Sequence, residues 1–453
     1  MRHYLPGMIS ILPLLLLACR GAPPPPARPP DLVLVVVDTL RADHLSLYGH
    51  PRATSPNLDA VGTEAVVFER ALSHAGWTLP AMASILTGRL PSEHQATRDP
   101  TDPLRFNRMD PQIPTMASLL ADQGYRTAAW VNNTYMAPEF ALNKGFEVYD
   151  YEGSGAYDGR SAAATVQAAL AWLAASDQPA FAFVHIMEPH YPYLPPPHLQ
   201  RRFTGPGEPP VDLLFFSPAE LSTTARWTKS FTPEQRAWIE RLYDEEILAA
   251  DESIGDLVAG LQSQGRWDHT VLAVTADHGE ELWDHGAFEH GHALYGELIR
   301  VPLVLRAPDL PARRVQHLVD HADLFQTLLA MAGATAPAEA HGTDLRGILD
   351  PDRAVLSEDC LYGPPRVALT QGDQRLIVNL DTRVANLFRL DQGAQGDAKV
   401  LDDALANQLA PALLEAMTQQ RGDLMLRTPA ARTAPLTPQA IEQLRSLGYL
   451  SGE

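Results

Sequence analysis

The run LVLVVV at residues 32–37 constrains the fold of this 453-residue chain more than any other feature. A continuous stretch of apolar, mostly β-branched residues is typical of a strand buried on both faces of a parallel sheet. We predict further strands at residues 126–131, 180–185, 270–274 and 301–305, and helices at residues 113–123, 161–175 and 232–261. This alternation predicts an α/β fold in which helices sandwich a large, mostly parallel sheet.

The pattern changes after about residue 335. Residues 366–380 and 383–390 are predicted hairpin strands, and residues 440–447 a final helix. We therefore divide the chain into a main domain at residues 31–337 and a smaller C-terminal α+β part at residues 338–453, packed on the main sheet. Residues 205–228, which are rich in proline and polar residues, are a predicted surface insertion near the site.

The first 30 residues read MRHYLPGMISILPLLLLACRGAPPPPARPP. A basic start and an apolar run too short to span a bilayer predict a signal peptide over residues 1–18. The run ends in LLAC, which resembles a bacterial lipobox, so we expect lipidation of Cys19 and a proline-rich tether over residues 19–30. The protein would then be lipid-anchored in the bacterial cell envelope, on its periplasmic or extracellular face. The alternatives are a plain secretory signal cut nearby and a cysteine present by chance.

The chain is strongly acidic, with a formal net charge of −20. Such a surface repels nucleic acid and anionic membranes, so we expect no nucleic-acid partner and membrane contact through the lipid anchor only. It also repels anionic esters unless a cation lies in the site, which makes a divalent metal an expected cofactor. The two cysteines are Cys19 and Cys360, and no intramolecular disulfide is expected because Cys19 is predicted to carry lipid.

Two predicted strands are followed closely by acidic residues. Asp38 comes directly after residues 32–37, and Asp277 and His278 follow the strand at residues 270–274. Ligands of open α/β sheets bind at the carboxyl ends of strands, so these side chains are candidates for one site. Carboxylate oxygens with an imidazole nitrogen are good zinc ligands. The alternative is that they only cap or begin the helices that follow.

Thr78 lies in the segment WTLPAMASILTGR, just before a helical run with Pro80 in its first turn. A hydroxyl at a helix N-terminus lies where backbone amides and the helix dipole favour an anion. A divalent metal beside it makes the alkoxide accessible near neutral pH, which predicts a nucleophile. The alternative is that Thr78 is an ordinary N-cap.

Imidazole and acidic groups gather in two further segments. FVHIMEPHYPY contains His185, Glu188 and His190, and WDHGAFEHGHALYGE contains His285, His290 and His292. A lone histidine is more often structural or exposed than catalytic, but these groups lie beside the two candidate strand ends. They could bind ester oxygens, protonate a leaving group or hold a second metal.

A series of motifs in the chain resembles the sulfatase branch of the alkaline phosphatase superfamily. In order, they are VVVDTLRADHLSLYG, TLPAMASILTGRLPSEH, GYRTAAWVNN, FVHIMEPHYPY, TADHGEEL and LYGELIRVPLVLRAP. The resemblance covers about residues 31–345, with a family-like tail, TPQAIEQLRSLGYL. It implies the family fold, with residues 31–337 as the catalytic domain.

The resemblance also implies roles for individual residues. The implied metal ligands are Asp38, Asp277, His278 and Thr78, and Thr78 is at the same time the implied nucleophile. His190 matches the family histidine that contacts the ester, and His292 or His290 falls where the family has a basic residue near the ester.

Several positions depart from true sulfatases. Their signature, C/S-x-P-S-R, begins with the residue that is oxidised to an aldehyde, and here that residue is Thr78. Ala81 and Met82 replace the serine and arginine, Thr39 replaces the second acid of an Asp-Asp pair, and His278 replaces an asparagine ligand. The Gly-Lys-Trp-His segment that holds sulfate is missing. Because threonine cannot become formylglycine, these departures favour phosphorus over sulfur.

Phosphodiesterases and phosphoethanolamine transferases of the superfamily use a metal-bound threonine. The asparagine that contacts the transferring group in the phosphodiesterases would be Asn132 or Asn133 here, unless both belong to an ordinary polar loop. A second metal would take ligands such as Glu188, His190 and His292. The histidine ligand favours zinc or manganese, with calcium left open.

Three functions follow from these patterns. The first is a metal-dependent phosphoester hydrolase or transferase with a metal-bound threonine nucleophile. The second is a sulfatase, and the third is a non-catalytic lipoprotein that binds a ligand. In the first two, the partner is an anionic ester: a small molecule, a glycan or a lipid headgroup.

Overall fold

The structure is a computed structural model, which describes residues 28–99, 105–153, 159–207, 209–212, 214, 216, 220, 229–390, 397–399, 411, 415 and 433–446. The predicted signal peptide, Cys19 and most of the predicted tether lie outside these residues, as does much of the predicted insertion at residues 205–228. The lipid anchor therefore stays a prediction.

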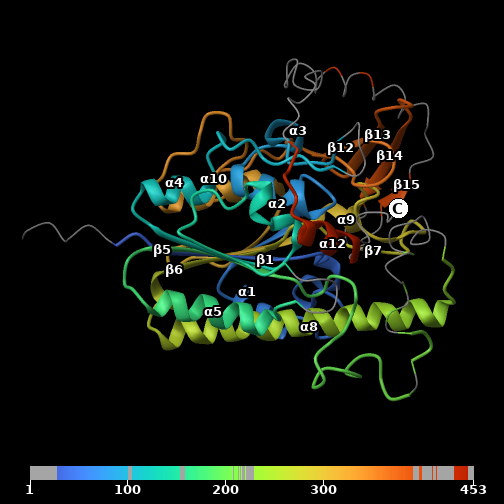
Figure 1. Ribbon diagram of the computed structural model, residues 1–453, viewed down its shortest axis with the longest axis horizontal. Coiled ribbons are helices and arrows are strands. Elements are labelled where there is room, and N and C mark those ends of the chain that lie inside the picture. Colours follow the sequence, from blue (N-terminus) through green and yellow to red (C-terminus); the bar gives the residue numbers. More distant parts are fainter. Residues whose placement is uncertain are drawn as a thin grey trace, which may run out of the picture.

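A large sheet forms the centre of the fold (Figure 1). It has eight strands in the order β10-β2-β9-β6-β1-β5-β3-β4. Neighbouring strands run parallel, except that β9 is antiparallel to β2 and to β6. The strands are β1 (Asp31–Val37), β2 (Val66–Leu72), β3 (Arg126–Val131), β4 (Val148–Tyr151), β5 (Ala180–Ile186), β6 (Thr270–Ala276), β9 (Arg300–Arg306) and β10 (Arg313–Asp320). This confirms the predicted α/β class and all five strands predicted for the main domain.

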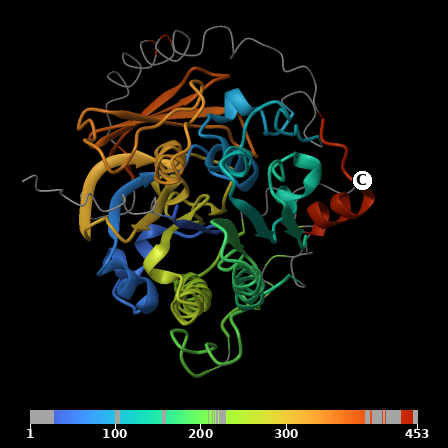
Figure 2. The same ribbon diagram turned by 90° about the vertical axis from the view of Figure 1, so that its left-hand side faces the viewer.

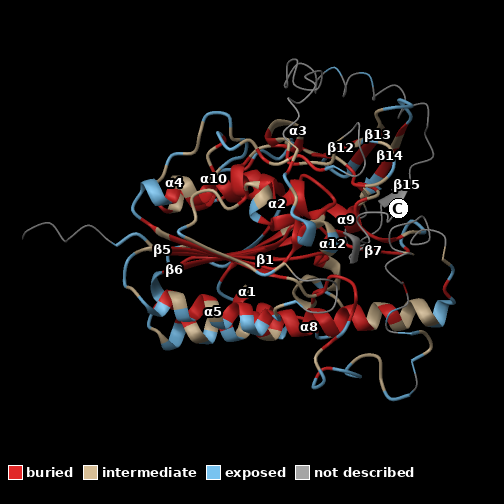
Figure 3. Cartoon of the chain, in the orientation of Figure 1, coloured by how far each residue is buried: buried red, intermediate tan, exposed pale blue. Residues whose placement is uncertain are grey.

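Helices cover both faces of the sheet (Figure 1). One face carries α1 (Pro56–Gly62), α5 (Ala162–Ala174) and α8 (Pro233–Ser263), and the other carries α2 (Thr78–Thr87), α4 (Met116–Asp122) and α10 (His321–Met331). The buried residues lie between these layers, while the outward sides of α5 and α8 are exposed (Figure 3). The core is therefore the interior of a helix–sheet–helix sandwich.

A second sheet has five antiparallel strands in the order β11-β12-β13-β14-β15. It lies on the side of the molecule away from α5 and α8 (Figure 2). Its strands are β11 (Ala354–Glu358), β12 (Arg366–Gln371), β13 (Gln374–Asn379), β14 (Ala385–Leu390) and β15 (Asp397–Lys399). The predicted hairpins are confirmed, and α12 (Pro438–Ser446) confirms the final helix. Three further short elements are α3 (Pro91–His94), α9 (Gly296–Ile299) and the two-stranded sheet of β7 (Glu281–Leu282) with β8 (Phe288–Glu289).

The start of the helix predicted at residues 113–123 is wrong. α4 begins at Met116, because Thr115 is its N-cap: the Thr115 side chain accepts from Ser118 N, and Ser118 Oγ accepts from Thr115 N at 2.9 Å. This reciprocal capping supplies partners for the first turn of the helix and leaves Pro114 outside it.

Candidate active site

The register of the central strands brings the candidate acids together. β1 pairs with β6 in parallel, with Val37 opposite Ala276, so Asp38 and Asp277 leave adjacent strands at the same level. His278 follows at once. All three side chains are fully buried and form one of the two clusters of ligand atoms found in the described residues. The structure thus brings together the side chains that follow these two strand ends.

Four atoms of this site face one another. His278 Nδ1 donates to Gly279 O at 2.9 Å, which leaves the lone pair of Nε2 directed away from the backbone. Nε2 lies 3.3 Å from Thr78 Oγ1, 3.4 Å from Asp277 Oδ2 and 3.7 Å from Asp38 Oδ1. The two carboxylate oxygens are buried and have no donor in the part of the chain that the structure describes. A set of unpaired acceptors around one point suits a divalent cation, so these residues fit the metal that the family implies.

The pKa shifts of the buried acids and of His278 also suit a cation site. Burial raises the pKa of Asp277 well above its usual range, and the neighbouring Asp38 raises it further. Burial also opposes the ionisation of Asp38, but the imidazoles of His185, His190 and His278 outweigh it and lower the pKa of Asp38 to about 2. Burial lowers the pKa of His278, which favours the neutral form that binds metals. When both carboxyls are ionised, a positive charge between them stabilises the pair.

Thr78 is the first residue of α2, and it does not cap the helix. The N-cap is Trp77, in an extended conformation, and no side chain makes a capping bond there. The alternative that Thr78 serves as an N-cap is therefore wrong. Its hydroxyl instead lies 3.3 Å from His278 Nε2 and 3.4 Å from Asn133 Nδ2, in a fully buried position.

The structure separates the two candidate asparagines. Asn133 Oδ1 accepts from Tyr135 N, which fixes the amide so that Nδ2 donates to Asp38 Oδ2 at 2.7 Å and faces Thr78. Asn132 is used elsewhere: Nδ2 donates to His185 O and Thr165 Oγ1, and Oδ1 accepts from Arg160 Nε. Asn133 is thus placed for contact with a substrate, whereas Asn132 holds neighbouring elements together.

His185 is one of the six candidate groups of the sequence analysis, which assigned it no role of its own. It lies inside β5, fully buried, and its Nδ1 accepts from Asn132 N at 3.3 Å. The proton therefore sits on Nε2, which is 3.4 Å from Asp38 Oδ2. Its position within an apolar strand was the available signal, because a polar residue in a fully buried strand needs a partner.

Four further predicted residues are His190, His290, His292 and Glu188, and the three histidines do not share one position. The His290 ring lies 4.5 Å from that of His278 and 5.1 Å from that of His190, centroid to centroid, and His290 Nδ1 contacts Glu280 Oε1 at 3.0 Å. His292 Nε2 contacts Glu281 Oε2 at 2.7 Å instead. The structure thus places His290 against the candidate ligand His278 and His190 against His290, whereas His292 contacts Glu281.

Glu188 accepts from Ala162 N, at the first turn of α5, with a distance of 3.0 Å to Oε1. Burial raises its pKa. Glu188, His190 and His292 do not form a cluster of ligand atoms within the described residues. The expectation of a second metal on these residues is therefore not supported.

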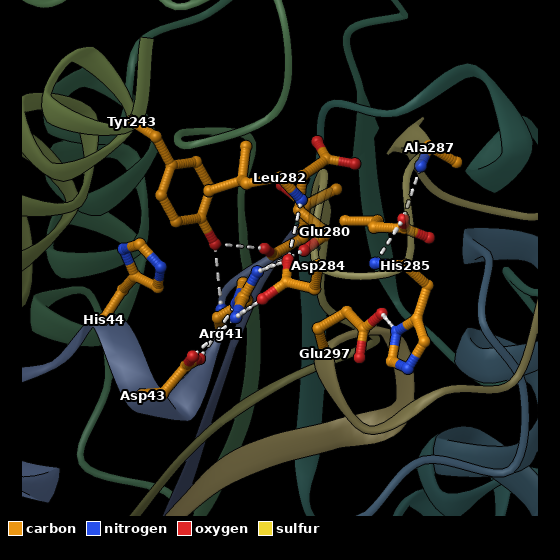
Figure 4. Close-up of polar contacts among 12 residues, drawn as sticks. Arg41, Asp43, His44, Tyr243, Glu280, Leu282, Asp284, His285, Ala287 and Glu297 are labelled. Atoms are coloured by element: carbon orange, nitrogen blue, oxygen red, sulfur yellow. Dashed lines mark hydrogen bonds and ion pairs between the residues drawn. The ribbon is translucent and has the colours of Figure 1, made fainter. Parts of the chain in front are cut away.

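Arg41 organises the loop that follows Asp38 (Figure 4). Its buried guanidinium pairs with Asp43 at 2.6 Å and with Asp284 at 2.7 Å, and it donates to Glu280 O. Because two carboxylates already neutralise it, Arg41 supports the site and is not a free cation for an ester.

Tyr243 ties the same loop to α8, because its hydroxyl donates to Thr39 O at 2.6 Å and accepts from Arg41 N at 2.9 Å (Figure 4). We expect Tyr243→Phe to lower the free energy of unfolding by about 1–3 kcal/mol, since two buried backbone groups lose their partner. Urea denaturation measures this. An unchanged free energy of unfolding would mean that water or a backbone shift replaces the hydroxyl.

The second cluster of ligand atoms comprises His44, His50 and Asp244. Asp244 Oδ1 already contacts His44 Nδ1 at 2.7 Å, and its Oδ2 accepts from Arg52 Nε at 2.5 Å. A guanidinium on the only carboxylate of the cluster competes with a cation. This cluster therefore joins the loop after β1 to α8 as an ion pair.

Comparison with known proteins shows which family the chain belongs to. The sulfatase family model matches residues 30–334. The chain belongs to the sulfatase family. The ulvan-active sulfatase of Formosa agariphila is 26% identical over 361 residues, which span 71% of this chain and 66% of that protein. Human arylsulfatase A is 26% identical over 366 residues, 71% of this chain and 68% of that protein.

The same fold is present in solved structures. The phosphonate monoester hydrolase of Agrobacterium radiobacter matches 87% of this chain and 96% of its own, with a TM-score of 0.71 and 20% identity. The family and fold implied by the sequence motifs are thus confirmed, and the protein is a hydrolase of the sulfatase branch of the alkaline phosphatase superfamily.

Proposed function

We propose that this protein is a metal-dependent phosphoester hydrolase or transferase with Thr78 as its nucleophile. The observation that carries the proposal is the Thr78 hydroxyl, 3.3 Å from His278 Nε2 and beside two buried carboxylate oxygens that have no donor among the described residues. The Thr78 hydroxyl does not cap α2, and its surroundings suit a cation. A cation held by Asp38, Asp277, His278 and Thr78 would supply positive charge beside the hydroxyl and the ester oxygens.

The residues of the chain have separate tasks in this proposal. Thr78 Oγ1, having lost its proton to solvent, forms a bond to phosphorus, and the bond from phosphorus to the leaving oxygen breaks. Asn133 Nδ2, fixed by its neighbours, donates to an oxygen of the transferring group. His190 and His290 neutralise the charge that develops on that group, and one of them donates a proton to the leaving oxygen. Water or an acceptor alcohol then cleaves the bond between phosphorus and Thr78 Oγ1.

Phosphorus is favoured over sulfur by the residues around Thr78. A threonine cannot be oxidised to the aldehyde whose hydrate expels sulfate by elimination. Ala81 and Met82, where true sulfatases have a serine and an arginine, are both fully buried apolar residues of α2. The phosphonate monoester hydrolase fold supports the same class of ester, although likeness in fold does not fix a substrate.

Sulfate ester hydrolysis is the second candidate, because the relatives by sequence are sulfatases. The two are separated by the hydrolysis of p-nitrophenyl phosphate, bis-p-nitrophenyl phosphate, p-nitrophenyl phenylphosphonate and p-nitrophenyl sulfate. The protein is first treated with chelator and then supplied with zinc, manganese or calcium. We expect turnover of a phosphorus ester to exceed that of the sulfate by a large factor, with zinc or manganese most effective. Dominant sulfate turnover that depends on Thr78 would overturn the phosphorus assignment.

The substrate we propose is an anionic ester that is a small molecule, a glycan or a lipid headgroup. We also propose that lipid on Cys19 holds the enzyme to the cell envelope. None of the helices in the described residues is both long and apolar enough to cross a membrane. Mass spectrometry of the N-terminal peptide from the native host tests the anchor, since a diacylglyceryl group on Cys19 is expected.

A further inference from the structure

One short connection in the C-terminal part contacts both sides of the candidate active site. It joins β11 to β12 and runs from Glu358 to Arg366. Glu358 N donates to His74 O at 2.8 Å, close before Thr78 in the chain. Tyr362 N donates to Gly291 O at 2.8 Å, and Arg366 Nη1 contacts His292 O. The connection thus holds the segment before the nucleophile and the segment that carries His290.

Asp359 makes the contact nearest to the nucleophile. Its Oδ2 accepts from Trp77 Nε1 at 3.1 Å, and Trp77 is the fully buried residue directly before Thr78. Asp359 adopts φ +76°, a left-handed conformation that is strained for a non-glycine residue. Burial and the neighbouring Glu358 raise the pKa of Asp359 to about 7. The carboxyl of this partly buried residue thus bonds the Trp77 indole as well as the Cys360 backbone, and the strained backbone beneath the indole bond points to a positioning role.

The nucleophile segment, the histidine segment and the connection are closely packed against one another. Gly291 N donates to Gly76 O at 2.9 Å, so the histidine segment and the nucleophile segment are also bonded to each other. A Cβ on Gly76 would lie 2.9 Å from Ala293 O. Gly291 has φ +81°, and a Cβ there would lie 3.0 Å from Leu361 Cβ. A displacement of the connection is therefore transmitted to both segments.

We propose that Asp359 is a positioning residue that sets the place of Thr78 Oγ1 through the indole of Trp77. The inference rests on the proposed role of Thr78 as nucleophile. The bond fixes the indole, the indole fixes the extended N-cap residue of α2, and Thr78 follows without an intervening residue. Attack by a hydroxyl is sensitive to misplacement of about 1 Å, which costs as much as 10²-fold in rate. The second sheet thus contributes to the active site without touching the substrate.

The test compares two variants of Asp359. Asp359→Gly removes the carboxyl and relieves the left-handed conformation, whereas Asp359→Asn keeps an acceptor oxygen in the same shape. With the metal-loaded enzyme and the best p-nitrophenyl substrate, we expect Asp359→Gly to lower kcat about tenfold, with KM changed less than about twofold. Asp359→Asn should keep kcat within about twofold. Equal losses in the two variants, or a kcat for Asp359→Gly within twofold of the wild type, would overturn the proposal.

Trp77→Phe supplies an independent test, because it removes the donor and keeps an aromatic ring. We expect it to lower kcat about as much as Asp359→Gly, and the double variant to be no worse than the worse single one, since both break the same bond. Additive losses would show that the two residues act separately. This variant also serves if Asp359→Gly does not fold.

Two controls separate positioning from stability and from the proposed function. Val378→Ala opens a cavity in a small apolar cluster of the second sheet that does not include the connection, so it should lower the melting temperature and leave kcat unchanged. A loss of kcat in Val378→Ala equal to that in Asp359→Gly would mean that general loosening explains both. Thr78→Ala is measured in parallel: if it stays active, the proposed function fails, whereas if it is inactive and Asp359→Gly is fully active, only the positioning role fails.

Discussion

Replacing Thr78 with alanine is expected to lower kcat by about 10³-fold or more at saturating metal, with the fold intact. The methyl side chain of alanine cannot form a bond to phosphorus, and no neighbouring hydroxyl in the described contacts takes its place. Thr78→Ser keeps a hydroxyl and should retain measurable turnover, although it loses the methyl group that packs in this fully buried position. Steady-state kinetics with the substrate selected by the ester comparison measures both.

A threonine on the same helix provides the matched control. Thr87, at the other end of α2, is also buried, but its hydroxyl donates to Ala83 O within the helix. We expect Thr87→Ala to change kcat by less than about twofold and the free energy of unfolding by about 1 kcal/mol. If Thr78→Ala retained full activity, the nucleophile assignment would be wrong. If both variants lost activity equally, the loss would reflect damage to α2 rather than missing chemistry.

The buried strands and their ends were predictable because a strand that is buried on both faces has a continuous run of apolar residues. Six apolar residues precede Asp38, and parallel pairing with β6 carries Asp277 to the same level. Strands without such an apolar run were not predicted. β4 is half-buried and reads VYDY, and β10 reads RRVQHLVD with an exposed start. β2 reads VVFERAL and has a bulge in its pairing with β9, which interrupts its apolar pattern.

Contacts between segments distant in sequence account for what the sequence could not decide. Asn132 and Asn133 are equal candidates by spacing, and only the position of His185 and Arg160 turns one amide away from Thr78. In the same way, His290 and His292 differ in their partners, because His290 contacts Glu280 and His292 contacts Glu281. Asp359 lies outside every motif of the main domain, and its link to Trp77 crosses 282 positions of the chain. Such pairings follow from packing and not from local pattern.

Replacing Asp277 with asparagine is expected to make the metal-free protein more stable and to abolish its stabilisation by metal. Asp277 Oδ1 accepts from Thr39 N and His278 N, and an amide oxygen can accept both bonds. Asp277 Oδ2 is buried without a donor in the described contacts, so ionising this carboxyl carries a desolvation cost, about 1–3 kcal/mol, that the neutral amide avoids. Because the folded pKa of Asp277 is raised, the metal-free wild type should lose stability as pH rises above about 4. Asp277→Asn should lack this loss.

Thermal unfolding with chelator and with zinc or manganese measures both effects. The wild type should gain about 4 kcal/mol at a free metal concentration near 1,000 times Kd, and Asp277→Asn should gain almost none. Asp251→Asn is the matched control: Asp251 is a buried carboxyl on α8 whose pKa burial raises to about 6, but it is satisfied by Asn57 and Leu58 N and lies outside the metal cluster. It should keep the full gain with metal. An equal gain in Asp277→Asn would mean that metal binds elsewhere, and the ligand set of Asp38, Asp277, His278 and Thr78 would have to be abandoned.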